Sequence, residues 1–312
     1  MIQLHAKDVP CIEMPDIGAF STCDTVASAA AQMDAACREF GYFKLANHRI
    51  DPERTLAVIA ESQAFFALPA SEKEAFRADI RTQFLGYRSL GAEKSLFHGG
   101  AEACEQYRIG NCHDPEKGAD RIDRSFFHAP FTRSLSFFHE MNALAERLMA
   151  LAAIGNNQEP EIFAPYFAAP MHRLGLNYYE PGSGKRIGNR VGYGMSPHVD
   201  RAVFTLVIQD ERGLEVLSPH GDWISVPAGP GEVCGFIGDY FQRWTNGGFR
   251  AVQHRVGEVA KDRISIQYKH KPSHATLVSP LAPFTIDRDE PARYEPFDTG
   301  PQYERLLAYL LS

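Results

Sequence analysis

The sequence predicts a mainly β protein with flanking helices, in which short strands form a sandwich or barrel. From about residue 172 to residue 271, short alternating segments are separated by glycine, proline and asparagine turns, as is typical of these folds. Phe204, Leu206 and Ile208 occupy alternate positions there, so they share one face of a strand. Upstream segments have the apolar periodicity of helices, and we expect these helices to pack against the barrel.

Caps and periodicity define the predicted elements outside this region. Asp51 precedes Pro52 at a helix start, and Ser71 begins a capping-box pattern for another helix. The predicted helices span residues 24–40, 52–66, 71 onward, 132–154 and 301–312, and a strand spans 42–46. The segment 81–131 has few periodic runs, so we expect loops there, with short strands near residues 106–109.

Composition excludes several classes of protein. The chain has 312 residues and a formal net charge of −7, which argues against binding to nucleic-acid phosphates. No apolar run approaches the roughly 18 residues of a transmembrane helix, and the start has no signal-peptide architecture. The six cysteines form no C-x-x-C pair, which predicts reduced thiols in a cytoplasmic protein.

A short motif in the β region has the spacing of a metal site. His198 and Asp200 are two residues apart, so on a strand their side chains share a face, roughly 7 Å apart. His254 is a candidate third ligand from a neighbouring strand. Two imidazoles and one carboxylate form a facial triad, which suits non-haem Fe(II). Twelve histidines are scattered along the chain, so the triplet alone is a weak signal.

A second motif follows His254 closely. Arg263 and Ser265 lie on one face of a predicted strand, and Ile264 and Ile266 lie on the other. A guanidinium beside a hydroxyl suits a carboxylate, because arginine presents a planar fork of donors. The alternative is a solvated sheet face that carries an ordinary surface arginine.

Together these motifs resemble the metal triad and cosubstrate anchor of the Fe(II)/2-oxoglutarate-dependent dioxygenases. More narrowly, the chain resembles the isopenicillin N synthase-like branch, over about residues 9 to 272. Segments that also fit this branch are 41–48, 65–69, 177–181, 205–210, 213–216, 221–227, 238–239 and 245–247. The resemblance implies a double-stranded β-helix, or jelly roll.

The resemblance also implies roles for particular residues. The triad would hold Fe(II), and 2-oxoglutarate would chelate the iron through its 1-carboxylate and keto oxygen. Its far carboxylate would pair with Arg263 and Ser265, assisted by Tyr179 and Asn177. The resemblance also implies O2 as the second cosubstrate and ascorbate as a reductant. Such an enzyme oxidises a small organic substrate by hydroxylation, desaturation or ring closure. Succinate and CO2 are released.

The expected organisation is a single catalytic domain over residues 1–312. It would comprise a helix-rich part over 1–170, a jelly-roll core over 171–275, and a tail with a helix over 276–312. By analogy with bacterial relatives, the partner is a small molecule such as an amino acid or a natural-product intermediate. We expect no nucleic-acid or membrane partner, and a monomer or homodimer.

Substrate contacts are expected outside the motifs of the metal and the cosubstrate. The glycine-rich stretch 81–112 carries Arg81, Arg88, Tyr107 and Arg108, and Arg201 follows the metal motif directly. Arg88, Tyr107 and Arg201 together suit an anionic or polar substrate, whereas the alternative is that the arginines are surface charges. The C-terminal helix either closes the pocket as a lid or covers the outside of the barrel.

Three other functions fit parts of this pattern. An oxidase or ring-closing enzyme of the same family would use no 2-oxoglutarate and would bind the substrate's own carboxylate at Arg263. The Asn177-x-Tyr179 element favours 2-oxoglutarate over that alternative. A barrel with Zn(II) or another metal would act without oxygen as a hydrolase or isomerase. A non-catalytic binding module would contain no metal.

Overall fold

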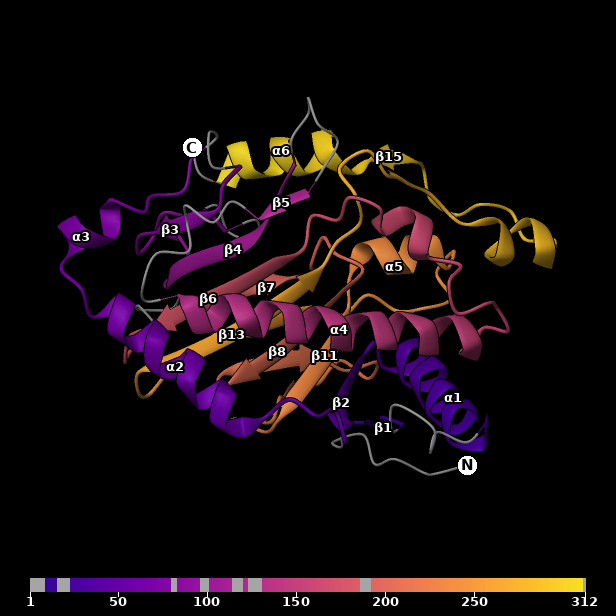
Figure 1. Ribbon diagram of the computed structural model, residues 1–312, viewed down its shortest axis with the longest axis horizontal. Helices are drawn as coiled ribbons and strands as arrows, with labels where there is room; N and C mark the ends of the chain where they lie inside the picture. Colours follow the sequence, from indigo (N-terminus) through magenta and orange to yellow (C-terminus); the bar gives the residue numbers. More distant parts are fainter. Residues whose placement is uncertain are drawn as a thin grey trace.

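A computed structural model describes residues 9–15, 23–79, 83–95, 101–113, 120–122, 131–185 and 192–310 (Figure 1). Arg81 of the predicted substrate stretch lies outside these residues. Two facing sheets form the centre of the molecule, and helices cover the outer face of the larger sheet. None of the helices in the described part of the chain is both long and apolar enough to cross a membrane.

The larger sheet has nine strands in the order β1-β2-β11-β8-β13-β6-β4-β3, with β5 paired to β4. Its strands are β1 Cys11–Glu13, β2 Tyr42–Ala46, β3 Gly86–Arg88, β4 Glu105–His113, β5 Asp120–Ile122, β6 Arg173–Tyr179, β8 Phe204–Gln209, β11 Val233–Ile237 and β13 Arg263–His270. Only the β1–β2 pairing is parallel among the pairings of the described strands in this sheet. The order follows strand pairing in space and not the order of the chain.

The smaller sheet has four strands in the order β10-β9-β12-β7. Its strands are β7 Met195–His198, β9 Leu214–Leu217, β10 Trp223–Ser225 and β12 His254–Val256, and a separate two-stranded sheet joins β14 Leu277–Val278 to β15 Phe297–Asp298. A buried cluster that includes Val207 of the larger sheet and Val216 of the smaller one fills part of the space between them. This arrangement creates an interior lumen.

Helices pack on the opposite face of the larger sheet. Figure 1 shows α4 lying across the strands, with α1 and α2 beside it. The helices are α1 Cys23–Glu39, α2 Pro52–Phe66, α3 Ala70–Glu74, α4 Thr132–Gly155, α5 Asp239–Trp244 and α6 Thr299–Leu310, with single 3₁₀ turns at Ala164–Phe167, Ala282–Phe284 and Ile286–Arg288. Leu144, Leu148 and Leu151 of α4 are buried in one core cluster with Leu206 and Ile208 of β8. The predicted alternation of β8 is therefore confirmed.

Several predicted elements agree closely with the structure, since local signals define them. The helices over 24–40 and 52–66 and the strand over 42–46 correspond to α1, α2 and β2. The carboxylate of Asp51 accepts a hydrogen bond from the amide of Glu53 at 2.9 Å and caps α2, as the sequence predicts.

One prediction about local structure is wrong, and another is too short. The helix predicted to start with a capping box at Ser71 is the short α3, whose N-cap is Pro69 without a side-chain cap bond. A strand does lie at the predicted residues 106–109, but it is the nine-residue β4 and not a short strand. Pairing of β4 with β6 and β3 stabilises this strand, and such tertiary pairing is not encoded in the local pattern.

Candidate active site

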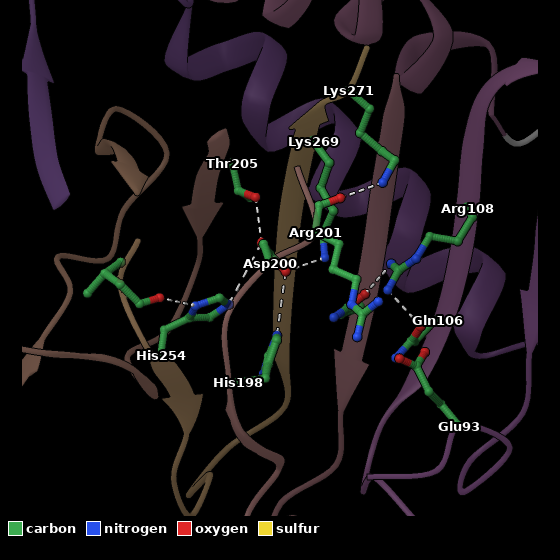
Figure 2. A network of polar contacts seen from close by, with 12 residues as sticks. Glu93, Gln106, Arg108, His198, Asp200, Arg201, Thr205, His254, Lys269 and Lys271 are labelled. Atoms are coloured by element: carbon green, nitrogen blue, oxygen red, sulfur yellow. Dashed lines mark hydrogen bonds and ion pairs between the residues drawn. The ribbon is translucent and has the colours of Figure 1, made fainter. Parts of the chain in front are cut away.

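The predicted metal ligands converge at one end of the lumen (Figure 2). His198 ends β7, and the register of β12 on β7 places His254 directly opposite it. Asp200 lies two residues beyond the end of β7. One ligand atom from each of the three side chains lies within 4.8 Å of the others. The Nε2 atoms of His198 and His254 are 3.6 and 3.8 Å from the Asp200 carboxylate oxygens.

The protonation states of Asp200 and His254 suit a divalent metal. Burial opposes ionisation of Asp200, but Lys269, His254 and His198 together hold the pKa of its carboxyl well below its usual value. Burial, aided by the neighbouring His198, lowers the pKa of His254 to about 3. Asp200 is therefore an anion and His254 is neutral at pH 7, as metal coordination requires.

Two residues that the sequence motifs did not single out hold the Asp200 carboxylate. The Nζ of Lys269 donates to Oδ1 of Asp200 at 2.7 Å, and the Oγ1 of Thr205 donates to Oδ2. Lys269 and Thr205 are a cross-strand pair of β13 and β8, so neighbouring strands fix the carboxylate from two sides. Strand alternation puts Lys269 on the same face of β13 as Arg263 and Ser265.

The predicted cosubstrate anchor has two buried polar atoms without partners. Arg263 and Ser265 have no exposed surface. The Nη2 of Arg263 donates to the Oε1 of Gln209 at 2.5 Å. In contrast, the Nη1 of Arg263 and the Oγ of Ser265 have no hydrogen-bond partner among the described residues. Burying unpaired polar groups costs about 1–3 kcal/mol each, so a carboxylate that accepts from both atoms fits this place.

Tyr179 and Asn177 lie beside this pair on the adjacent strand. The β6–β13 register pairs Arg263 with Tyr179 and Ser265 with Asn177. The ring centroid of Tyr179 is 4.7 Å from the guanidinium carbon of Arg263. Asn177 donates to the Tyr179 hydroxyl at 3.2 Å, and its Oδ1 accepts from Arg108 at 2.6 Å. Asn177 therefore connects the predicted anchor with Arg108.

A cavity of about 120 Å³ opens next to the triad. Its wall contains His198 and Asp200 together with side chains from β3, β4, β6, β13 and α6. The helix α6 contributes Tyr303, Leu306 and Leu307 to the wall, so it covers the cavity and does not lie only on the outside of the barrel. The charged residues of the wall are Arg88, Glu93, Lys94, Glu102, Arg108, Arg173, Asp200, Arg201, Lys269 and Lys271.

Of the three predicted substrate residues, two line the cavity and one does not. Arg88 and Arg201 line the cavity, although Arg88 already pairs with Glu93 at 2.8 Å. The prediction for Tyr107 is wrong, because this side chain lies in the hydrophobic core and stacks on Phe131 with 4.3 Å between ring centroids. Neighbouring residues of a strand point to opposite faces, so Arg108 and not Tyr107 faces the cavity.

Comparisons with known proteins agree with this architecture. The family model described as "non-haem dioxygenase in morphine synthesis N-terminal" matches residues 9–129, and that of the 2OG-Fe(II) oxygenase superfamily matches residues 170–272. Gibberellin 2-beta-dioxygenase 4 of Arabidopsis thaliana is 27% identical over 98% of this chain and 92% of its own length. The 2-oxoglutarate-Fe(II) type oxidoreductase hxnY of Emericella nidulans is 27% identical over 81% of this chain and 77% of its own.

Solved structures share the fold. A full-length protein of Neurospora crassa, crystallised in complex with alpha-KG, has a TM-score of 0.81 and 23% identity, with 96% of each chain covered. A putative 2OG-Fe(II) oxygenase family protein of Caulobacter crescentus has a TM-score of 0.76 and 22% identity, with 97% of this chain and 99% of that chain covered. The predicted jelly roll with flanking helices is confirmed.

A jelly roll with two histidines and one aspartate converging in its lumen defines the class of non-haem iron oxygenases. The chain belongs to the 2OG-Fe(II) oxygenase superfamily, in its isopenicillin N synthase-like branch. It is an oxidoreductase of a family that uses Fe(II), 2-oxoglutarate and O2.

Proposed function

We propose that this oxygenase holds Fe(II) through His198, Asp200 and His254 and anchors 2-oxoglutarate at Arg263 and Ser265. The observation that carries the proposal is a pair of buried atoms, Nη1 of Arg263 and Oγ of Ser265, that have no hydrogen-bond partner among the described residues. They belong to the same face of β13 as Lys269, which binds the Asp200 carboxylate. An oxygenase that takes a dicarboxylate needs such a place for the second carboxylate.

The neighbouring strand β6 supports the anchor. The ring of Tyr179 lies against the guanidinium of Arg263, and Asn177 donates to the Tyr179 hydroxyl. Both side chains are completely buried, so their positions are fixed by packing before any ligand arrives. Tyr179 and Asn177 thereby hold Arg263 in the orientation that a carboxylate needs.

The chain's own residues also prepare the metal site. Asp200 supplies a fixed carboxylate because Lys269 and Thr205 both donate to it, and the imidazole of His254 supplies a neutral nitrogen. When bound, iron and 2-oxoglutarate supply the oxygen activation that oxidises a substrate C–H bond, with succinate and CO2 released. Strands of the barrel and α6 line this place, which limits the access of water to it.

The size of the cavity supports a small organic substrate, oxidised by hydroxylation, desaturation or ring closure. About 120 Å³ beside the triad suits a compact molecule such as an amino acid or a natural-product intermediate, and not a polymer. A structural relative gives the same indication, since the Neurospora crassa protein was also crystallised with alpha-KG and thymine.

The test is the conversion of 2-oxoglutarate to succinate by the purified protein with Fe(II) in air, across a library of small organic acids and amino acids. We expect succinate in amounts that depend on Fe(II), on O2 and on one class of library compound. Oxygen-dependent consumption of a library compound without succinate would instead support the oxidase alternative. Turnover that continues under nitrogen would support a non-redox metal enzyme.

Thr205→Val is expected to weaken metal binding by at least about tenfold, because partners that orient metal ligands typically contribute 10- to 100-fold to affinity. Valine keeps the shape of threonine but cannot donate to Oδ2 of Asp200. Calorimetric titration with Mn(II) measures the effect independently of turnover. Thr55→Val is the matched control, since it removes another buried hydroxyl, in α2. Equal Mn(II) affinity in wild type and Thr205→Val would contradict this role.

A further inference from the structure

Four cations of the active-site cavity lack an anionic partner in the described part of the chain. The three other cations of the wall have partners: Arg88 pairs with Glu93, Lys269 pairs with Asp200, and Lys94 lies over the ring of Tyr309. The unpaired ones, called the cationic wall below, are Arg108, Arg173, Arg201 and Lys271. Figure 2 shows Arg108, Arg201 and Lys271 on the same side of the triad.

Two glycines of the larger sheet leave space for two of these arginines. The strand register places Gly175 of β6 opposite Arg108, and Gly110 of β4 opposite Arg173. A Cβ atom on Gly175 would collide with the Arg108 guanidinium. A Cβ atom on Gly110 would lie 2.7 Å from Cδ and 3.0 Å from Nη1 of Arg173. Glycine at both positions therefore makes room for the two guanidinium groups on the lumen side.

The hydrogen bonds of Arg108 leave its charge without a dedicated counterion. Arg108 donates to the amide oxygens of Asn177 and Gln106 at 2.6 and 2.7 Å, and both acceptors are neutral. The nearby carboxylate of Glu93 attracts Arg108, but that carboxylate already forms its ion pair with Arg88. One carboxylate thus serves two guanidinium groups, which leaves an excess of positive charge.

Arg173 and Lys271 are also buried, and neither has a counterion among the described residues. Arg173 is 4% exposed, donates to backbone carbonyls, including that of Asn111, and has a buried Nε without a partner among the residues described. The Nζ of Lys271 donates to the backbone carbonyl of Arg201 and lies 4.2 Å from the ring centroid of Tyr303.

The pKa of Lys271 reflects the positive charge of this wall. Its side chain is 2% exposed. Burial, with Lys269 and Arg173 nearby, holds the pKa of Lys271 well below its usual value. Buried cations without counterions are costly, and an anion among them would offset this cost.

The cationic wall is distinct from the predicted 2-oxoglutarate anchor. The register of β4 on β6 and of β6 on β13 places Arg108 level with Gln267, four residues from Arg263 on β13, which corresponds to about 13 Å along a strand. Asn177, which accepts from Arg108, lies between the two sites. Arg263 does not line the cavity that contains the cationic wall. A 2-oxoglutarate bound at Arg263 therefore leaves the cationic wall available to another molecule.

We propose that the cationic wall binds an anionic group of the substrate, and that the substrate is a small organic acid. The anionic group is a carboxylate or a phosphate ester, held by Arg108, Arg173, Arg201 and Lys271 while the remainder of the molecule extends toward the triad. This inference rests on the proposed function and adds the substrate class. It replaces the predicted contact at Tyr107 by its neighbour Arg108.

The test uses protein loaded with Mn(II) and saturated with 2-oxoglutarate, so that the anchor is occupied. Isothermal titration with phthalate, phenyl phosphate and neutral phthalamide compares two anions with an uncharged molecule of similar shape. We expect saturable binding of at least one anion and none of phthalamide. Arg108→Gln and Lys271→Gln should each weaken anion binding at least tenfold, and Arg108→Lys should weaken it less. The preferred anion distinguishes a carboxylate site from a phosphate site.

The matched control is Lys261→Gln, which removes an exposed ammonium that pairs with Glu211 outside the cavity. If Arg108→Gln does not fold, Arg201→Gln replaces it, because the Arg201 side chain is only half-buried. Equal binding of phthalamide, no binding of either anion, or unchanged affinity in the folded glutamine variants would each overturn the proposal.

A separate titration with 2-oxoglutarate alone distinguishes this proposal from the proposed function. A protein that binds phthalate or phenyl phosphate at the cationic wall but binds no 2-oxoglutarate would overturn only the proposed function. A protein that binds 2-oxoglutarate through Arg263 but neither anion would overturn only the substrate class.

Discussion

Asp200→Ala is expected to abolish turnover and to weaken Fe(II) binding by more than about a hundredfold. The loss should exceed a hundredfold, because removing a group that only orients a metal ligand already lowers metal affinity by 10- to 100-fold. Asp200 is the only carboxylate of the three-residue cluster, and removing it also leaves Lys269 without its anionic partner. His198→Ala and His254→Ala are expected to abolish turnover in the same way.

The measurements for this prediction are anaerobic calorimetry with Fe(II) and the rate of succinate formation. Asp222→Ala is the matched control, since Asp222 is exposed and lies outside the cluster. His220→Ala serves the same purpose for the histidine variants. Wild-type Fe(II) affinity or full activity in any triad variant would exclude that residue as a ligand.

Arg263→Ala is expected to weaken 2-oxoglutarate binding at least tenfold. Loss of a charge-assisted pair costs about 1.5–3 kcal/mol, and about 1.4 kcal/mol corresponds to a factor of ten. Arg263→Lys should restore only part of the affinity, because lysine lacks the planar fork. The absorbance band of the Fe(II)–2-oxoglutarate complex, titrated under nitrogen, reports the binding midpoint.

The control for lost positive charge is Arg293→Ala. Arg293 is exposed, pairs with Glu290 and lines neither the cavity nor the anchor, so the titration midpoint of this variant should equal that of the wild type. An unchanged midpoint in Arg263→Ala would favour the oxidase alternative, in which Arg263 binds the substrate's own carboxylate.

The clustering of His198, Asp200 and His254 and the shared face of Arg263 and Ser265 were predictable from sequence, because both depend on strand alternation. Arg263 and Ser265 share the lumen face of β13, as their spacing of two requires. His198 and Asp200 were predicted from the same spacing, although Asp200 lies beyond the end of β7. The position of His254 opposite His198 needed strand pairing, which the resemblance to a known family supplied.

The cationic wall was not predictable in the same way, since it depends on the register between distant strands. Tyr107 and Arg108 are adjacent, and only the pairing of β4 with β6 decides which of them faces the lumen. The space for Arg108 comes from Gly175, which is 67 positions further along the chain (175 minus 108). Lys269 and Thr205 likewise meet at Asp200 only after β13 and β8 have paired.

The most direct test of the central claim is a crystal structure of the protein grown or soaked anaerobically with Mn(II) and 2-oxoglutarate. We expect a metal ion bonded to His198, Asp200 and His254. We also expect the far carboxylate of 2-oxoglutarate to accept hydrogen bonds from Nη1 of Arg263 and Oγ of Ser265. A metal ion bound elsewhere, or a 2-oxoglutarate carboxylate bound at Arg108 and Lys271 instead, would contradict it.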